Sequence, residues 1–284
     1  MFGRQRSGSV VCSCGKLVGV HDAVCSHCGR RNPGLWGYAG ALRRLGSDLG
    51  FVKLLIGGSV LLYLVALLLS GGRIRMGSPF DFLGPSPVAL YLLGASGSVP
   101  VFELGRWWTV LSAGWLHGSL LHLLFNMLWV RQLAPATAEL YGAGRMVLIY
   151  TAGSVGGFLA SSVAGQYLFF LPRLLQGAAF TVGASAPIFG LLGALVWYGR
   201  RSGSRALGQQ AWTWALAMFV FGFLFAGVDN YAHAGGFAGG WLAARLLDPL
   251  RPERPGHVLT ALGLLAATLL AVLVSVLQSF TIAS

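Results

Sequence analysis

The sequence predicts an all-α polytopic membrane protein. Of the 284 residues, 55% are hydrophobic and only 10% are charged, a balance too apolar for a soluble globular domain. Apolar runs long enough to cross a bilayer recur along the chain. Lys and Arg residues gather in alternate connections between these runs, so we attribute the net charge of +12 to membrane topology and expect no nucleic-acid partner.

Residues 1–35 form a polar head that contains every cysteine of the chain. The cysteines form two close pairs, each followed by a glycine, as in zinc ribbons: Cys12, Cys14, Cys25 and Cys28. Four thiolates suit tetrahedral Zn²⁺, and so small a segment would depend on a metal to fold. The first pair is one residue tighter than usual, and His21 or His27 could replace a thiolate. Free thiols or two disulfides are the alternatives, although disulfides fit a reducing compartment poorly.

A basic linker, 36–50, precedes the first predicted span, the Leu- and Val-rich run 52–70. The connection 71–106 holds several prolines and short aromatic segments, which we expect at the membrane interface. It also contains Gly94-Ala-Ser-Gly97, which looks like a serine-nucleophile turn. No spanning helix follows to hold Ser96 in place, so we interpret this segment as an ordinary loop.

Six further spans are expected, which makes seven with the first. The second has an unusual polar content, the third is rich in glycine, the fourth opens among small residues and ends at two arginines, and the sixth repeats glycine at helical spacing. Their expected limits are 115–133, 146–163, 185–198, 211–226, 231–247 and 258–280. Residues 51–250 would contain the first six spans, and 251–284 the seventh.

The distribution of Lys and Arg gives the expected orientation. With the N-terminus in the cytoplasm, 16 of the 20 Lys and Arg residues fall on the cytoplasmic side. The C-terminus then lies outside, and spans two, four and six all run inward. His122, Asn126, Ser185 and His233 consequently share the outer leaflet. Polar groups inside a membrane are costly and usually functional.

Ser185 begins the fourth span, where free backbone N–H groups would lie beside its hydroxyl. Such N–H groups, together with a base, are what a serine nucleophile and its oxyanion need. Taken alone, Ser185 is better explained as a helix N-cap, because capping serines far outnumber catalytic ones. His122 and Asn126, four residues apart, share one helical face.

His233, Gly236 and Gly240 lie on one face of the sixth span, and Gly190 and Ala194 offer a matching small-residue face on the fourth. If these faces pack, Ser185 and His233 meet. Plain helix packing would explain the glycines equally well, and a hydrogen-bonded structural histidine would explain His233 alone.

Together these motifs resemble the rhomboid intramembrane serine proteases. The resemblance covers roughly residues 51–250 and includes the histidines and asparagine of the second helix (His117, His122, Asn126), the motif Gly183-Ala-Ser185-Ala, and His233-x-x-Gly236-x-x-x-Gly240. It implies a catalytic dyad of Ser185 and His233. It also implies an oxyanion hole of His122, Asn126 and the Ser185 N–H, and no cofactor for catalysis. The seventh helix and the cysteine head would be accessories.

Three positions depart from the family pattern. Ala186 replaces a glycine after the serine, and Phe189 replaces a tyrosine that stacks on the histidine, keeping the ring. The Trp-Arg pair of the first loop is reduced to Gly105-Arg106, which weakens the expected anchoring of that loop. Asp229 could orient His233, although we expect Asp229 or Asn230 to cap the sixth span.

The resulting expectation is a serine endopeptidase in a bacterial inner membrane that cuts transmembrane segments of other proteins. The active site would face the extracytoplasmic side. The substrate helix must unwind locally, because helical carbonyls are hydrogen-bonded and covered. Two rivals are a non-catalytic rhomboid-like binding or escort protein and a transporter. The chain has both Ser185 and His233, which escort relatives lack in part, and it shows no internal repeat of the kind transporters use.

Overall fold

The computed structural model describes residues 6–12, 14–34, 46–78, 81–172, 175–225 and 227–283. The chain divides into two compact units, Met1–Phe51 and Val52–Ser284. Most of the predicted basic linker, 36–50, lies outside the described residues; only 46–50 are described.

The head contains a two-stranded antiparallel hairpin. Strand β1 (Ser9–Val11) pairs with β2 (Leu17–Gly19), and Val10 lies opposite Val18. The buried side chains of this unit form a very small core that includes two of the cysteines: Val10, Cys12, Val18, Val20 and Cys25. Such a core can contribute little stability of its own.

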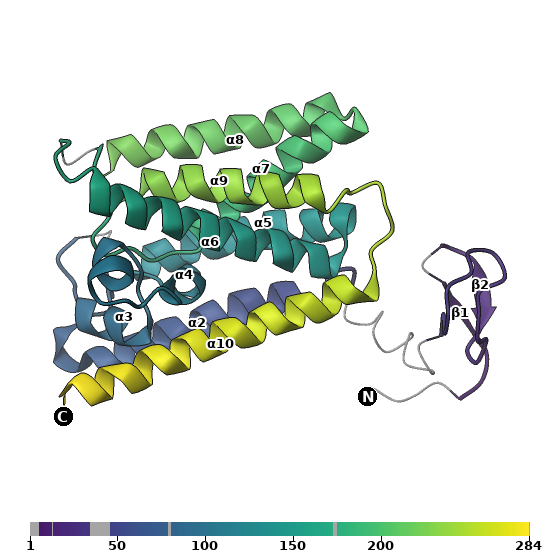
Figure 1. Cartoon of the computed structure of the whole chain (residues 1–284), viewed down its shortest axis with the longest axis horizontal. Coiled ribbons are helices and arrows are strands. Elements are labelled where there is room, and N and C mark those ends of the chain that lie inside the picture. Colours follow the sequence, from purple (N-terminus) through teal and green to yellow (C-terminus); the bar gives the residue numbers. More distant parts are fainter. Residues whose placement is uncertain are drawn as a thin grey trace. The chain divides into compact units, whose positions relative to one another are not determined.

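The second unit is a helical bundle, and its long helices follow the predicted spans closely (Figure 1). Their bounds are α2 Phe51–Ser70, α5 Leu120–Tyr141, α6 Ala143–Tyr167, α7 Ser185–Ser202, α8 Arg205–Leu224, α9 Asn230–Leu246 and α10 Pro255–Ala283. By length and composition, Phe51–Arg73, Ala143–Tyr167 and Pro255–Ser279 could each cross a membrane.

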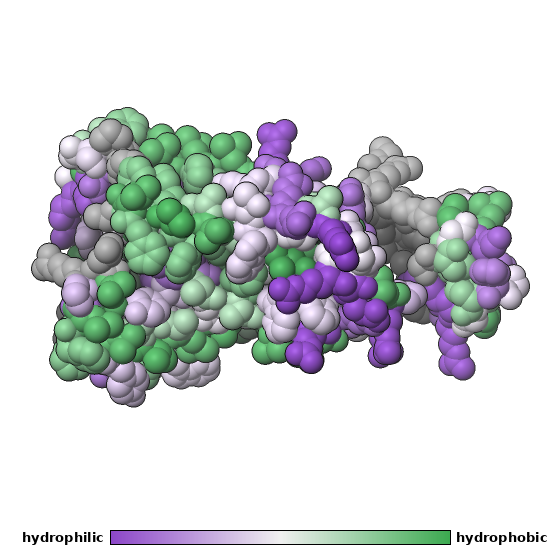
Figure 2. Space-filling view, turned by 90° about the horizontal axis from the view of Figure 1, so that it is seen from above, coloured by the Kyte–Doolittle hydropathy of each residue, from purple (hydrophilic) through white to green (hydrophobic). Residues whose placement is uncertain are grey.

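The sides of the bundle are largely apolar, whereas exposed charged residues lie near the ends of its helices. Exposed leucines follow the outer faces of α2 and α10, among them Leu61, Leu68, Leu259 and Leu269. Figure 2 shows hydrophobic side chains spread over much of the bundle and hydrophilic ones gathered near one end of it. An apolar outside is what a lipid environment requires, so the fold is that of a polytopic membrane protein.

Helix α5 begins at Leu120 instead of Trp115, so the second span starts later than predicted. Ser119 has extended backbone, and its Oγ accepts the His122 N–H at 3.2 Å as an N-cap. Trp115 ends a short helical segment ahead of α5, and His117 lies in the connection that follows it. His117 therefore lies ahead of the helix that carries His122 and Asn126.

Helices α6, α7 and α9 form the tightly packed interior of the bundle. A Cβ added to Gly240 of α9 would lie 2.1 Å from the Gly190 carbonyl oxygen of α7, and one added to Gly236 would lie 2.2 Å from the Ala186 carbonyl oxygen. The two helices are therefore in backbone contact along the predicted glycine face. Their partners on α7 are Ala186 and Gly190, one turn earlier than the predicted pair Gly190 and Ala194.

The connection between α2 and α5 folds into short helical segments against the bundle. They are η2 Gly71–Arg73, α3 Pro87–Leu93, η3 Val99–Glu103, α4 Thr109–Ser112 and η4 Ala113–Trp115. Arg106, whose anchoring role the sequence left in doubt, is only 1% exposed. Its guanidinium lies 4.2 Å from the centre of the Tyr91 ring and donates to the Tyr91 carbonyl at 3.2 Å. The connection is therefore firmly anchored.

Helix α10 is bound to the core near both of its ends and is more than an appended helix. Near its C-terminal end, Arg106 donates to the Ser275 carbonyl at 3.0 Å, and Trp108 Nε1 donates to Ser275 Oγ at 3.0 Å. At its start, the Arg145 side chain of α6 donates to His257 Nδ1 at 3.1 Å and to the Pro252 carbonyl at 2.6 Å. Both arginines are buried.

Candidate active site

Ser185 occupies the first turn of α7, and it does not cap the helix. The N-cap residue is Ala184, which has no capping side chain. In contrast, α3, α5 and α9 are each capped by a side chain. The Ser185 hydroxyl is therefore not committed to the helix start, and the N–H groups of Ser185 and Ala186 lack a side-chain cap. This geometry removes the simplest structural explanation of Ser185 and leaves N–H donors beside its hydroxyl.

The chain reaches Ser185 along a short paired segment. Ser96 and Thr181 exchange backbone hydrogen bonds of 3.1 and 2.8 Å, and the Gly183 N–H donates to the Ala113 carbonyl at 3.0 Å. The segment around Ser96 lies between α3 and η3, outside any helix, as the loop prediction expected, and its backbone bonds make it an ordered part of the bundle. Ser96 is fully buried, so a substrate cannot reach its hydroxyl.

His122 lies against the backbone that leads to Ser185. Gly183 has a φ of +137°, and a Cβ added to it would lie 2.7 Å from His122 Nε2 and 3.8 Å from Ser185 Oγ. The His122 ring and the Ser185 hydroxyl therefore both lie beside the space that a side chain at position 183 would occupy. Only a glycine leaves this space empty. His122 Nδ1 accepts the Gly118 N–H at 3.3 Å. A neutral imidazole that accepts at Nδ1 carries its proton on Nε2, so His122 presents a donor to this space.

Asn126 is one turn below His122 on α5 and is 3% exposed. Its amide nitrogen donates to the His122 carbonyl at 2.9 Å, which leaves a second N–H on the same nitrogen. The predicted i, i+4 pair is therefore linked by this bond, and of the two residues it is His122 that lies beside the segment leading to Ser185.

His233 stacks on Phe189, as the family pattern implies for the aromatic residue at that position. The ring centres are 4.2 Å apart and the planes differ by 14°. His233 is 5% exposed, and its Nδ1 has no hydrogen-bond partner among the described residues. Asp229 does not orient this ring: it accepts the Ala232 N–H at 3.0 Å as the cap of α9 and the Ser161 hydroxyl at 2.5 Å. The expected capping role of Asp229 is confirmed.

His117 lies behind His122. Its ring meets the His122 ring edge to face, with centres 5.2 Å apart, and it is fully buried. Within the described part of the chain, neither of its ring nitrogens has a hydrogen-bond partner. His117 thus packs directly against the ring of the oxyanion candidate.

The head brings its four cysteine sulfurs together as a candidate metal centre. All four lie within 4.8 Å of one another, with Cys12 Sγ 3.7 Å from Cys28 Sγ and Cys14 Sγ 3.8 Å from Cys25 Sγ. The cysteines are free, which excludes the disulfide alternative in this structure. Zn–S bonds of about 2.3 Å in a tetrahedron would place the sulfurs ~3.8 Å apart, so the cluster fits a four-thiolate metal site.

The fold and site define a helical membrane protein in which His122 and Ser185 lie beside Gly183, and His233 stacks on Phe189 of the helix that Ser185 begins. The rhomboid domain model matches residues 104–249. The chain belongs to the rhomboid family.

Curated relatives agree with this membership. The chain is 35% identical over 146 residues to rhomboid protease GluP of Bacillus subtilis, covering 50% of this chain and 26% of GluP. It is 35% identical over 177 residues to RHOMBOID-like protein 5 of Arabidopsis thaliana, covering 60% of this chain and 53% of that protein. A third relative, rhomboid-like protease 5 of Toxoplasma gondii, is 32% identical over 177 residues, 58% of this chain and 19% of that protein. The chain thus spans from about a fifth to about half the length of these relatives.

Proposed function

We propose that this protein is an intramembrane serine endopeptidase with Ser185 as nucleophile and His233 as general base. The observation that carries the proposal is the start of α7, which has no side-chain cap. There the half-buried Ser185 and the Nε2 of His122 lie beside the same empty space at Gly183. A serine that serves only to cap a helix would have no reason to keep its hydroxyl free there.

The catalytic groups of the proposed reaction are the chain's own residues, and water is the second reactant. The Ser185 oxygen attacks a substrate carbonyl carbon while His233 takes the hydroxyl proton, and His233 gives that proton to the amine that leaves as the peptide bond breaks. A water that loses a proton to His233 then attacks the resulting ester, which releases the new carboxylate and restores the Ser185 hydroxyl. Negative charge develops on the carbonyl oxygen. The His122 Nε2–H, the free Asn126 N–H and the Ser185 N–H would donate to it. The Phe189 ring holds the plane of the His233 imidazole.

Covalent labelling tests this proposal directly. A fluorophosphonate should modify the purified protein, and peptide mass spectrometry should place the adduct on Ser185. Labelling would also separate the protease from the runner-up function, a rhomboid-like protein that binds or escorts membrane clients. A folded protein that binds transmembrane segments but takes no label at Ser185 would favour the escort function and contradict ours.

The substrate class and orientation follow from the same proposal. The site lies within a bundle whose outer face is apolar, so a substrate would arrive as a transmembrane segment of another protein in the lipid bilayer. Arg145 and Arg201 contact the segment after α9, through its carbonyls and Asp248 respectively, so the arginine-rich connections gather at one end of the bundle. By the bias of Lys and Arg, we place that end in the cytoplasm of a bacterial cell and Ser185 toward the extracytoplasmic side.

Asn126→Ala is expected to lower kcat by about tenfold or more with little change in thermal stability, because it removes one oxyanion donor. Initial rates on a single-span reporter would measure kcat and KM. Thr137→Val, also on α5 but with its hydroxyl bonded to the Leu133 carbonyl, is the matched control and should keep normal kcat. An unchanged kcat in Asn126→Ala would remove this residue from the site.

We also propose that the cysteine cluster of the head holds Zn²⁺ as a structural metal, with Cys12, Cys14, Cys25 and Cys28 as ligands. The full-length protein should contain one zinc per chain by elemental analysis. Cys25→Ser should lose it, because three thiolates hold zinc less tightly. Ser26→Ala, an exposed neighbour, should keep it. A head that stays folded without metal would contradict the proposal. Removing residues 1–35 should leave cleavage in detergent largely intact, because no head residue takes part in the proposed reaction.

A further inference from the structure

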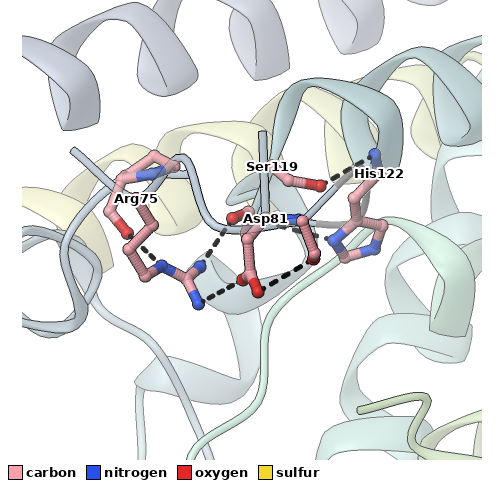
Figure 3. Close-up of polar contacts among 7 residues, drawn as sticks. Arg75, Asp81, Ser119 and His122 are labelled. Atoms are coloured by element: carbon pink, nitrogen blue, oxygen red, sulfur yellow. Dashed lines mark hydrogen bonds and ion pairs between the residues drawn. The ribbon is translucent and has the colours of Figure 1, made fainter. Parts of the chain in front are cut away.

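An arginine between α2 and α3 reaches the start of α5, and the proposed mechanism does not use it. The Arg75 Nη2 donates to the Gly118 carbonyl at 2.7 Å, and Nη1 forms an ion pair with Asp81 at 2.8 Å (Figure 3). Its Nε donates to the Pro85 carbonyl at 3.3 Å. All three nitrogens of the guanidinium therefore have acceptors, and two of these are backbone carbonyls.

The backbone around Arg75 is fixed against the same region. Arg75 and Gly84 exchange backbone hydrogen bonds of 2.8 and 3.0 Å, and the Leu120 N–H donates to the Phe82 carbonyl at 3.1 Å. The same segment is also bonded to α2, because the Tyr63 hydroxyl donates to the Leu83 carbonyl at 2.5 Å. The segment that presents Arg75 is thus attached to both α2 and the first turn of α5.

Gly118 connects this arginine to the oxyanion candidate. Its carbonyl accepts from Arg75, and its N–H donates to His122 Nδ1 at 3.3 Å. Figure 3 shows Arg75, Asp81, Ser119 and His122 grouped around this link. A glycine backbone has wide conformational freedom, so the contact from Arg75 to the Gly118 carbonyl restricts the residue whose N–H, in the preceding peptide, holds the imidazole. The bond at Nδ1 is also what places the His122 proton on Nε2.

We propose that Arg75 is a positioning residue for His122. It holds Gly118 so that the Gly118 N–H fixes the orientation and tautomer of the His122 imidazole. The inference rests on the proposed oxyanion role of His122, and Arg75 itself touches no reacting atom. The ion pair with Asp81 is a minor part of this role, because the two side chains are 40% and 44% exposed and such pairs contribute little.

The first test compares turnover with substrate binding. Arg75→Ala should lower kcat by about ten- to 100-fold, as expected when a donor group is slightly misplaced, with KM changed less than about twofold. Arg75→Lys keeps one donor for the Gly118 carbonyl and should lose less. Two matched controls should stay near wild type: Arg73→Ala, an exposed arginine of the same segment, and Asp81→Asn. A normal kcat in folded Arg75→Ala would overturn the proposal.

A double-mutant cycle separates positioning from general support of the fold. In a His122→Ala background, Arg75→Ala should cause almost no further loss of kcat, because the group that it positions is gone. An additive loss would show a structural role and overturn the inference. If Arg75→Ala does not fold, the cycle is run with Arg75→Lys, and a fully active Lys variant in that case overturns the inference too.

The cycle also distinguishes this inference from the proposed function. A His122→Ala protein with normal kcat would overturn both the oxyanion role of His122 and the role of Arg75, but would leave Ser185 as nucleophile. Cleavage that survives Ser185→Ala would instead contradict the proposed function itself.

Discussion

Ser185→Ala is expected to abolish cleavage of a single-span reporter in liposomes, with activity falling to the background of protein-free vesicles. The hydroxyl oxygen is the atom that forms the proposed covalent intermediate, and no other group in the site can replace it. The protein should still fold, because alanine suits the first turn of a helix and Ser185 makes no capping bond there. His233→Ala should be equally inactive, since it removes the base.

The double mutant should be no worse than either single mutant, because nucleophile and base act as one unit. Ser96→Ala is the matched control: Ser96 is a buried serine whose backbone pairs with the segment leading to Ser185, and alanine preserves that pairing. It should cut the reporter normally. Cleavage by a folded Ser185→Ala protein would disprove the nucleophile assignment.

Gly240→Leu is expected to prevent α7 and α9 from packing, and it should destabilise the protein more than any of the active-site substitutions. The first atom of the new side chain would lie within 2.4 Å of three Gly190 backbone atoms, and backbone cannot turn aside as a side chain can. Overpacking typically costs about 1–3 kcal/mol, and contact with backbone that cannot move aside should bring the loss to about 3 kcal/mol or more.

Thermal unfolding in detergent would measure this loss, and the stacking of Phe189 on His233 should be lost with it. Gly263→Ala is the matched control, because it is also a glycine within a long helix and nothing lies within 4 Å of its new Cβ. That variant should be as stable as wild type or slightly more so. A stable, active Gly240→Leu protein would contradict the close approach of the two helices.

The features that could be predicted well are those that depend on the spacing of residues close together in the sequence. Gly236 and Gly240 lie one helical turn apart, so their shared face and its contact with α7 could be inferred before any coordinates. The stacking of Phe189 on His233 was likewise implied by the family pattern and is confirmed. The start of α5 was misplaced because apolar content favoured Trp115, whereas the capping bond of Ser119 decides the helix boundary.

The features that sequence reasoning missed depend on contacts between distant residues. Arg106 and the Ser275 carbonyl are 169 residues apart, and Arg75 and the Gly118 carbonyl are 43 apart. Both acceptors are backbone carbonyls, which every residue carries, so no side-chain pattern marks them. The only available signal was that an arginine in so apolar a protein is costly unless its charge is paired. That signal predicts a hydrogen-bond partner but does not identify the residue that provides it.

The attachment of α10 has a consequence for biosynthesis. During translation, α2 to α9 leave the ribosome before α10, yet the buried guanidinium groups of Arg106 and Arg145 have acceptors on α10 and on the segment just before it. Until α10 is inserted, both charges lack part of their hydrogen bonding, and the connection that Arg106 anchors is incompletely held. A nascent chain that already contains both residues of the proposed dyad is therefore not yet fully folded. Its folding is completed only when α10, which contributes no group to the proposed reaction, has been synthesised.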